Sequence, residues 1–121
     1  MGDEKNLLGM IGMCRRAGKT VIGTDMVCEF LRKQNEKKSA KAQNNNQDGE
    51  KIDIIVLESS DTAENTHKKI SDKCLFYNVK HVRLFADSEA LGKALGKRAV
   101  AAVAIADEGF CRAILGKLKE S

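Results

Sequence analysis

At residues 52–57 the chain reads Ile52-Asp53-Ile54-Ile55-Val56-Leu57, a short run that is almost continuously apolar and rich in β-branched residues. Such a run is typical of a strand that is covered on both faces, because neither face has to meet water. Segments of helical periodicity stand before and after it, and helices and strands alternate along the chain. This alternation predicts an α/β protein, a three-layer α/β/α sandwich on a mixed and mostly buried sheet.

Helices are predicted where apolar residues recur at three- and four-residue spacing. Their markers are Leu7, Leu8, Ile11 and Cys14; Val27, Phe30 and Leu31, after Gly23; Ile70, Cys74 and Tyr77; Leu91 and Leu95; and Phe110, Ile114, Leu115 and Leu118. Two more strands are predicted at residues 81–85 and 100–106. Side chains suited to helix capping precede three helices: Asp61 or Thr62, Asp87 or Ser88, and Asp107 with Glu108.

The length of the chain predicts a single domain over residues 1–121, since 121 residues that are 42% hydrophobic can bury one core. Residues 34–50 contain no large apolar side chain, so we expect a low-complexity, disordered loop there. Three Lys and three acidic residues cancel within this segment. We therefore interpret it as a passive insertion in preference to a basic loop that binds RNA.

The formal net charge of +4 and a pI near 8.9 describe a mild cationic excess, which favours an anionic partner but is equally usual for an ordinary basic surface. The four Cys residues stand alone, without a Cys-x-x-Cys pair or a His at zinc-ligand spacing. We expect buried thiols in a reducing cytoplasm, and neither a metal site nor a cofactor. No signal peptide or membrane span is visible.

Gly18-Lys19-Thr20 resembles the end of a nucleotide-binding P-loop, but its spacing is wrong. That motif has four residues between its first Gly and the Gly-Lys pair, whereas five separate Gly12 from Gly18. Catalytic signatures such as GxSxG or a local Cys-His pair are also missing from the sequence. We interpret His67 and His81 as isolated surface or capping residues, and we expect a protein that is not an enzyme.

Aromatic residues are scarce, with no Trp, one Tyr and four Phe. Phe30, Phe76, Phe85 and Phe110 fall on positions expected to face the core, so they are not predicted to stack on unpaired bases. If the protein reads RNA, it is expected to use backbone amides, short polar groups and cations against a folded shape.

Two segments far apart in the sequence place glycine and basic residues where one element gives way to the next. The first reads Arg16-Ala17-Gly18-Lys19-Thr20-Val21-Ile22-Gly23-Thr24-Asp25, and the second reads Leu91-Gly92-Lys93-Ala94-Leu95-Gly96-Lys97-Arg98-Ala99-Val100-Ala101-Ala102-Val103-Ala104-Ile105. Further pieces are Asp61 with Glu64-Asn65-Thr66, Asp72-Lys73-Cys74 and Asp107-Glu108-Gly109-Phe110. In order and spacing these pieces resemble the kink-turn-binding ribosomal-protein superfamily of L-seven-Ae and L-thirty-e-like proteins, most of all its small bacterial YlxQ-type members.

The resemblance covers nearly the whole chain apart from residues 34–50, and it implies an L-thirty-e-like fold and a structured RNA ligand. The usual ligand of the superfamily is a kink-turn, a sharply bent RNA helix with tandem sheared G·A pairs. The residues that the resemblance implies for RNA contact are Arg15, Arg16, Lys19, Gly23, Thr24, Asp25, Met26, Glu29, Lys97, Arg98, Ala99 and Val100.

Within this set, the resemblance gives each segment a role. The helix that begins after Gly23 would enter the RNA major groove, where free N–H groups and partial positive charge can face phosphates or base edges. The loop at residues 97–100 would pack an apolar edge on a flipped-out base and bring cations to the backbone. The basic residues at positions 15, 16 and 19 would add phosphate contacts.

The sequence departs from the strongest kink-turn binders, which carry an Asn-Glu pair and a following Lys where this chain has Asp25, Met26 and Glu29. A weaker or differently tuned RNA target is therefore one interpretation, with ribosomal RNA and the ribosome among the candidates, and we expect no DNA specificity. The alternative function is a protein-interaction module on the same fold. For the site itself, the alternative is an ordinary helix cap and a solvated turn. We expect a monomer that does not bind membranes.

Overall fold

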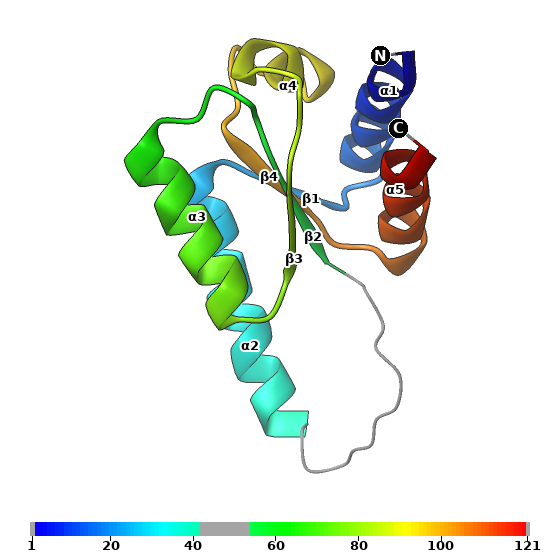
Figure 1. Ribbon diagram of the computed structural model, residues 1–121. Helices are drawn as coiled ribbons and strands as arrows, with labels where there is room; N and C mark the ends of the chain where they lie inside the picture. The colour runs from blue at the N-terminus through cyan, green and yellow to red at the C-terminus, as the bar shows by residue number, and fades with distance from the viewer. Residues whose placement is uncertain (1, 42–53, 121) are drawn as a thin grey trace.

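The computed structural model describes the backbone of residues 2–41 and 54–120. Helices and strands alternate over these residues, as predicted (Figure 1). In chain order the elements are α1 (Gly2–Arg16), β1 (Thr20–Ile22), α2 (Thr24–Lys41), β2 (Ile55–Glu58), α3 (Glu64–Phe76), β3 (Lys80–Arg83), α4 (Ser88–Ala94), β4 (Ala102–Ile105) and α5 (Glu108–Glu120).

The four strands form one mixed sheet in the order β1-β4-β2-β3. Strand β4 pairs antiparallel with β1 on one side and with β2 on the other, so that Val103 lies opposite both Ile22 and Leu57. Strand β3 runs parallel to β2 at the other edge. The chain of β4 therefore sits between two segments that are more than thirty residues apart in sequence.

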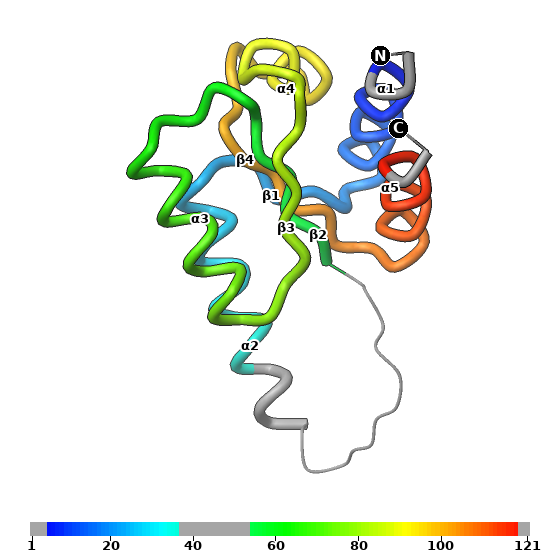
Figure 2. The backbone as a smooth tube through the Cα atoms, in the orientation of Figure 1, coloured from blue at the N-terminus to red at the C-terminus, as the bar shows by residue number. Residues whose placement is uncertain are grey.

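Helices cover both faces of the sheet, with α1 and α5 on one face and α2 and α3 on the other (Figures 1 and 2). Successive residues of β2 and β4 point to opposite faces, which is why these strands are apolar throughout. Leu57 and Ile105 enter the core beneath α1, α4 and α5, whereas Val56 and Ala104 enter the core beneath α2 and α3. The predicted α/β/α sandwich is confirmed.

Strand β1 and the length of α2 were not anticipated from the sequence. A strand of three residues is too short to show a hydrophobic period of its own. Helix α2 continues to Lys41, so the prediction of a disordered loop is wrong for residues 34–41. The rest of that prediction, residues 42–50, lies outside the described residues.

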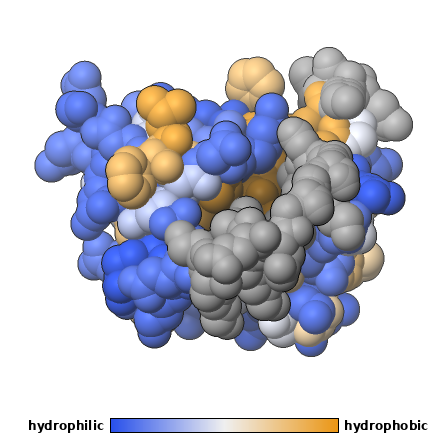
Figure 3. Space-filling view, turned by 90° about the horizontal axis from the view of Figure 1, so that it is seen from below, coloured by the Kyte–Doolittle hydropathy of each residue, from blue (hydrophilic) through white to orange (hydrophobic). Residues whose placement is uncertain are grey.

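Two of the four Phe residues do not lie where the pattern predicts. Phe30 and Phe110 pack against the two cores, but Phe76 and Phe85 are 77% and 90% exposed. Phe76 follows the exposed Leu75 in the last turn of α3 and packs edge-on against Tyr77. Seen from the side of that turn, the molecule shows separate hydrophobic groups on a largely hydrophilic surface (Figure 3). The core assignment of Phe76 and Phe85 is therefore wrong.

Two of the three helix caps predicted from the sequence are present in the structure. Asp87 accepts a hydrogen bond from the amide of Ala90, and Asp107 accepts one from the amide of Phe110. Helix α3 begins after Ala63 without a side-chain cap. Asp61 instead accepts hydrogen bonds from the backbone N–H and the hydroxyl of Ser88, and these lower the pKa of its carboxyl group. It thus ties the β2–α3 loop to the start of α4.

Within the described part of the chain, every helix is too short or too polar to cross a lipid bilayer.

The layered packing predicts unequal reactivity of the thiols. Burial raises the pKa of Cys14 to about 11 and that of Cys74 to about 12, so very little reactive thiolate forms at mildly alkaline pH. Cys28 is only half-buried, and although burial raises its pKa too, two nearby lysines oppose that effect. Peptide mapping after alkylation of the native protein should find Cys28 modified well before Cys14 and Cys74. Equal alkylation rates of the three thiols in the native protein would contradict this packing. In urea, where the packing is lost, the three thiols should react at similar rates.

Candidate nucleic-acid interface

The start of α2 is fixed by one glycine. Gly23 has a φ of +105°, a left-handed conformation that a side chain rarely adopts, and it turns the chain from β1 into α2. Its N–H donates to the carbonyl of Ala102 at 2.9 Å, and its carbonyl accepts from the amide of Val27 at 2.9 Å. The first residues of α2, Thr24, Asp25 and Met26, therefore stand beside the beginning of β4, with Met26 60% exposed.

The loop between α4 and β4 is held by its own backbone. The carbonyl of Gly92 accepts from the amides of Leu95 and Lys97, and Gly96 takes a φ of +72° to close the turn. The backbone of Ala99 lies so close to Gly92 that a Cβ there would stand 2.8 Å from it. This tight packing displays Lys97, Arg98 and Ala99 at the surface on a defined turn.

The two segments singled out in the sequence meet in the fold. Antiparallel pairing of β1 with β4 places Gly23 next to Ala102, a few residues beyond the basic loop. Near the end of α1, the guanidinium of Arg15 lies 3.1 Å from the position that a Cβ on Gly96 would take. The end of α1, the start of α2 and the loop at residues 96–101 thus form one edge of the molecule. We call residues 15, 16, 23–26, 29 and 97–99 the α2-loop edge.

Two of the predicted contact residues lie elsewhere. Val100 is 4% exposed and belongs to the core beneath α1, α4 and α5, so its side chain does not form an apolar surface on the loop. Lys19 is exposed but stands at the other end of β1, where its carbonyl accepts from the amide of Ala106. That position is about 13 Å of strand away from Gly23. The exposed Ala99 is the small apolar residue that the loop presents.

Cations balance the acidic residues of the α2-loop edge. Lys69 of α3 donates to the carboxylate of Asp25 at 3.0 Å, which raises the pKa of the lysine. Arg32 donates to Glu29 at 2.6 Å, and this hydrogen bond lowers the pKa of the carboxyl group. The Arg32 partner was visible as an i, i+3 spacing in the sequence. Lys69 was not, because it is 44 residues away from Asp25.

The cations of the loop between α4 and β4, by contrast, are not paired with acidic residues of the described part of the chain. Among residues 5–36 and 54–118, Lys97 and Arg98 form no ion pair, and both are exposed. Arg16, also exposed, borders a shallow groove between α1 and α4 that Gly12, Lys93 and Ala94 help to line. The net charge of the α2-loop edge is therefore positive, in spite of its two acids.

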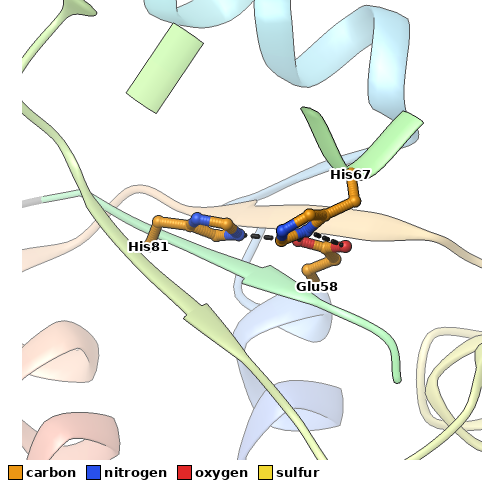
Figure 4. A group of neighbouring side chains, drawn as sticks. All are labelled: Glu58, His67 and His81. Atoms are coloured by element: carbon orange, nitrogen blue, oxygen red, sulfur yellow. Dashed lines mark hydrogen bonds and ion pairs between the residues drawn. The ribbon is translucent and has the colours of Figure 1, made fainter. Parts of the chain in front are cut away.

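A second polar cluster lies beyond this edge and was missed in the sequence. His67 of α3 and His81 of β3 both contact the carboxylate of Glu58, the last residue of β2, at 2.7–2.9 Å (Figure 4). The Glu58 side chain has no exposed surface, whereas those of His67 and His81 are 36% and 17% exposed. The interpretation of both His residues as isolated surface or capping groups is therefore wrong.

Known proteins resemble this chain over most of its length. It is 33% identical over 110 residues to the RNA-binding protein YlxQ of Bacillus subtilis (strain 168), covering 90% of this chain and 91% of that protein. The chain belongs to the YlxQ family. A second member of the family, the RNA-binding protein YlxQ of Enterococcus faecium, is 30% identical over 92% of this chain and 89% of its own length. No family model matches the sequence.

Solved structures show the same fold. A Bacillus halodurans protein of unknown function superposes with a TM-score of 0.72 at 24% identity, over 93% of this chain and 96% of the other. A 15.5 kD RNA-binding protein of Giardia lamblia superposes with a TM-score of 0.67 at 12% identity, over 99% of this chain and 88% of the other. The relatives confirm the predicted YlxQ-type family, and the solved structures confirm its α/β fold.

Replacing Gly92 by Ala should loosen the loop and destabilise the fold. The added Cβ would meet the backbone of Ala99 at 2.8 Å, and backbone cannot turn aside as the end of a side chain can. We expect a loss of about 1–3 kcal/mol in the free energy of unfolding, measured by urea denaturation. Gly9→Ala in α1 is the control, because its Cβ would meet nothing within 4 Å and helix propensity improves. A Gly92→Ala variant as stable as that control would contradict the close approach.

Proposed function

We propose that this protein binds a structured RNA, of kink-turn type, through the α2-loop edge, and that it does so without catalysis. The observation that carries the proposal is the contact of the two basic, glycine-containing segments, where the Gly23 N–H donates to the Ala102 carbonyl. An RNA ligand can meet a helix N-terminus and a cationic loop at once only if the fold brings them together. The names of the YlxQ relatives as RNA-binding proteins support the same class of ligand.

The charges on the α2-loop edge suit a phosphate backbone. Lys97 and Arg98 are free of acidic partners among the described residues, so contact with phosphate breaks no internal ion pair. The amides at the start of α2 add partial positive charge beside them. Asp25 would repel phosphate if it were unpaired, and Lys69 offsets that charge.

The start of α2 is suited to base edges more than to phosphates. The Asp25 carboxylate can accept hydrogen bonds from the amino groups of guanine or cytosine, while Met26 offers an apolar contact. Arg15 and Arg16 would hold the adjoining backbone. We propose ribosomal RNA as one candidate target, and a monomer in the cytoplasm as the working form.

Replacing Lys97 and Arg98 together by Ala should weaken binding to a labelled kink-turn RNA roughly tenfold, because two phosphate contacts disappear. The slope of log affinity against log salt should fall by about 1–2, since fewer counterions are released. Fluorescence anisotropy at several salt concentrations measures both quantities, with a duplex lacking the G·A pairs as the comparison RNA.

The matched control for this variant is Lys5→Ala with Lys80→Ala. It removes the same charge from exposed positions outside the α2-loop edge, in the first turns of α1 and at the start of β3. If both double variants lose the same affinity, the binding depends on overall charge and the α2-loop edge is not the site. If the native protein binds neither RNA, the fold serves protein partners instead.

The Lys69–Asp25 pair gives a second test of the same surface. Lys69→Ala should leave Asp25 unbalanced near the RNA and weaken binding about threefold, as expected for an exposed charge pair. Lys68→Ala is the control, because its ion pair is with Asp72 on α3 itself. Equal affinities of the two variants for the kink-turn RNA would show that Asp25 does not face the ligand.

A further inference from the structure

The cluster of Glu58, His67 and His81 brings together side chains from three separate elements. Glu58 ends β2, His67 lies in the first turns of α3, and His81 lies in β3 (Figure 4). In the parallel pairing of β2 with β3, His81 stands opposite Val56, so its side chain is on the same face of the sheet as that of Glu58. The cluster is thus built on packed elements and not on a flexible loop.

The distances place all three polar ends around one point. The Nε2 atom of His81 lies 2.7 Å from Oε1 of Glu58, and the Nδ1 atom of His67 lies 2.8 Å from Oε2. One ligand atom from each residue, two imidazole nitrogens and a carboxylate oxygen, lies within 4.8 Å of the others. Both nitrogens face the carboxylate, so three atoms that could become ligands of a cation converge.

This donor set has a specific chemistry. Two imidazoles and one carboxylate are a ligand set of Zn²⁺ sites that keep a fourth position for water, and imidazole also suits Co²⁺ and Ni²⁺. Ligand atoms about 2.0–2.2 Å from a tetrahedral ion are separated by about 3.3 Å. The present nitrogen–oxygen separations of 2.7–2.9 Å would have to grow by about half an ångström, and the two imidazole nitrogens, which lie within 4.8 Å of each other, would have to settle at the same spacing.

The protons on the two imidazole rings do not prevent a metal ion from taking the place of the hydrogen bonds to Glu58. In the hydrogen-bonded cluster each imidazole donates the N–H that faces Glu58. When a ring is neutral, its proton can move to the other nitrogen through solvent, and the freed lone pair then faces the cation. His67 is 36% exposed, so an ion has a path in and water can complete the coordination.

The buried carboxylate of Glu58 also has a cation beside it. Arg83 stands 3.6 Å from the carboxylate and donates to the carbonyl of Ser60 as well. The positive charge of Arg83 repels a cation at the site. We therefore expect a lower affinity for metal than in a structural site with four protein ligands.

We propose that Glu58, His67 and His81 bind a divalent transition-metal ion, Zn²⁺ in the first place, with water as the fourth ligand. This site lies on the α2/α3 side of the sheet and uses no residue of the α2-loop edge. Its ligands join β2, α3 and β3, so metal binding would clamp α3 to the outer edge of the sheet.

The experiment uses the full chain without a histidine tag, freed of metal with a chelator and titrated with Co²⁺. We expect one Co²⁺ per chain with the visible absorption bands of nitrogen and oxygen ligands, displaced by Zn²⁺. His67→Gln and His81→Gln should each weaken Co²⁺ binding at least tenfold, because each removes one of three protein ligands. Saturating Zn²⁺ should also raise the melting temperature of the native chain and leave those of the variants unchanged.

Two control variants test whether other nearby side chains bind the metal. Glu64→Gln removes an exposed carboxylate three residues before His67, and Cys28→Ser removes a half-buried thiol. Both should bind Co²⁺ like the native chain, without the intense charge-transfer band of a thiolate ligand. Circular dichroism checks that each histidine variant is folded, so the result does not depend on Glu58, whose burial makes it the riskier position.

Absence of cobalt bands at metal excess would overturn the proposal. So would bands that persist in both histidine variants, because the ligands would then lie elsewhere in the chain.

Discussion

The pairing of β4 on both of its edges is the constraint on which the rest of the structure depends. At its start, the carbonyl of Ala102 accepts the Gly23 N–H, and the carbonyl of Ala101 accepts the Ser59 N–H. The first bond fixes where α2 begins, and the second fixes the residue directly after Glu58. Two consecutive peptide groups thus position both the α2-loop edge and the histidine cluster, although their residues come from all parts of the chain.

Electrostatics divides the surface into paired and unpaired charge. Asp25 and Glu29 are each balanced by a cation, whereas Lys97 and Arg98 have no acidic partner among the described residues. Exposed ion pairs of this kind add little to stability, so their effect is on what the surface can bind. An edge with balanced acids and unpaired cations suits the proposed contact with a polyanion, and it leaves a carboxylate that could accept from a base amino group.

The sequence predicts what local periodicity encodes and misses what depends on distant partners. Buried strands and amphipathic helices were found because their apolar spacing repeats. Strand β1 was missed because three residues carry no period, and Phe76 and Phe85 were misplaced because an apolar side chain at the end of an element can point to solvent. The family resemblance predicted most residues of the α2-loop edge. It could not show that Lys69 forms an ion pair with Asp25 or that Val100 is buried.

The cluster of Glu58, His67 and His81 is another feature that the sequence could not predict, because its residues come from three separate elements. Each His is unremarkable in sequence, and a Glu at the end of an apolar strand looks like the point where the strand reaches water. In the fold, Glu58 has no exposed surface, and a buried carboxylate costs several kcal/mol unless it is paired. A valine or leucine at this strand position would avoid that cost. The proposed metal site would account for keeping a carboxylate here, because a cation is a ligand that the buried carboxylate and the two partly buried imidazoles share.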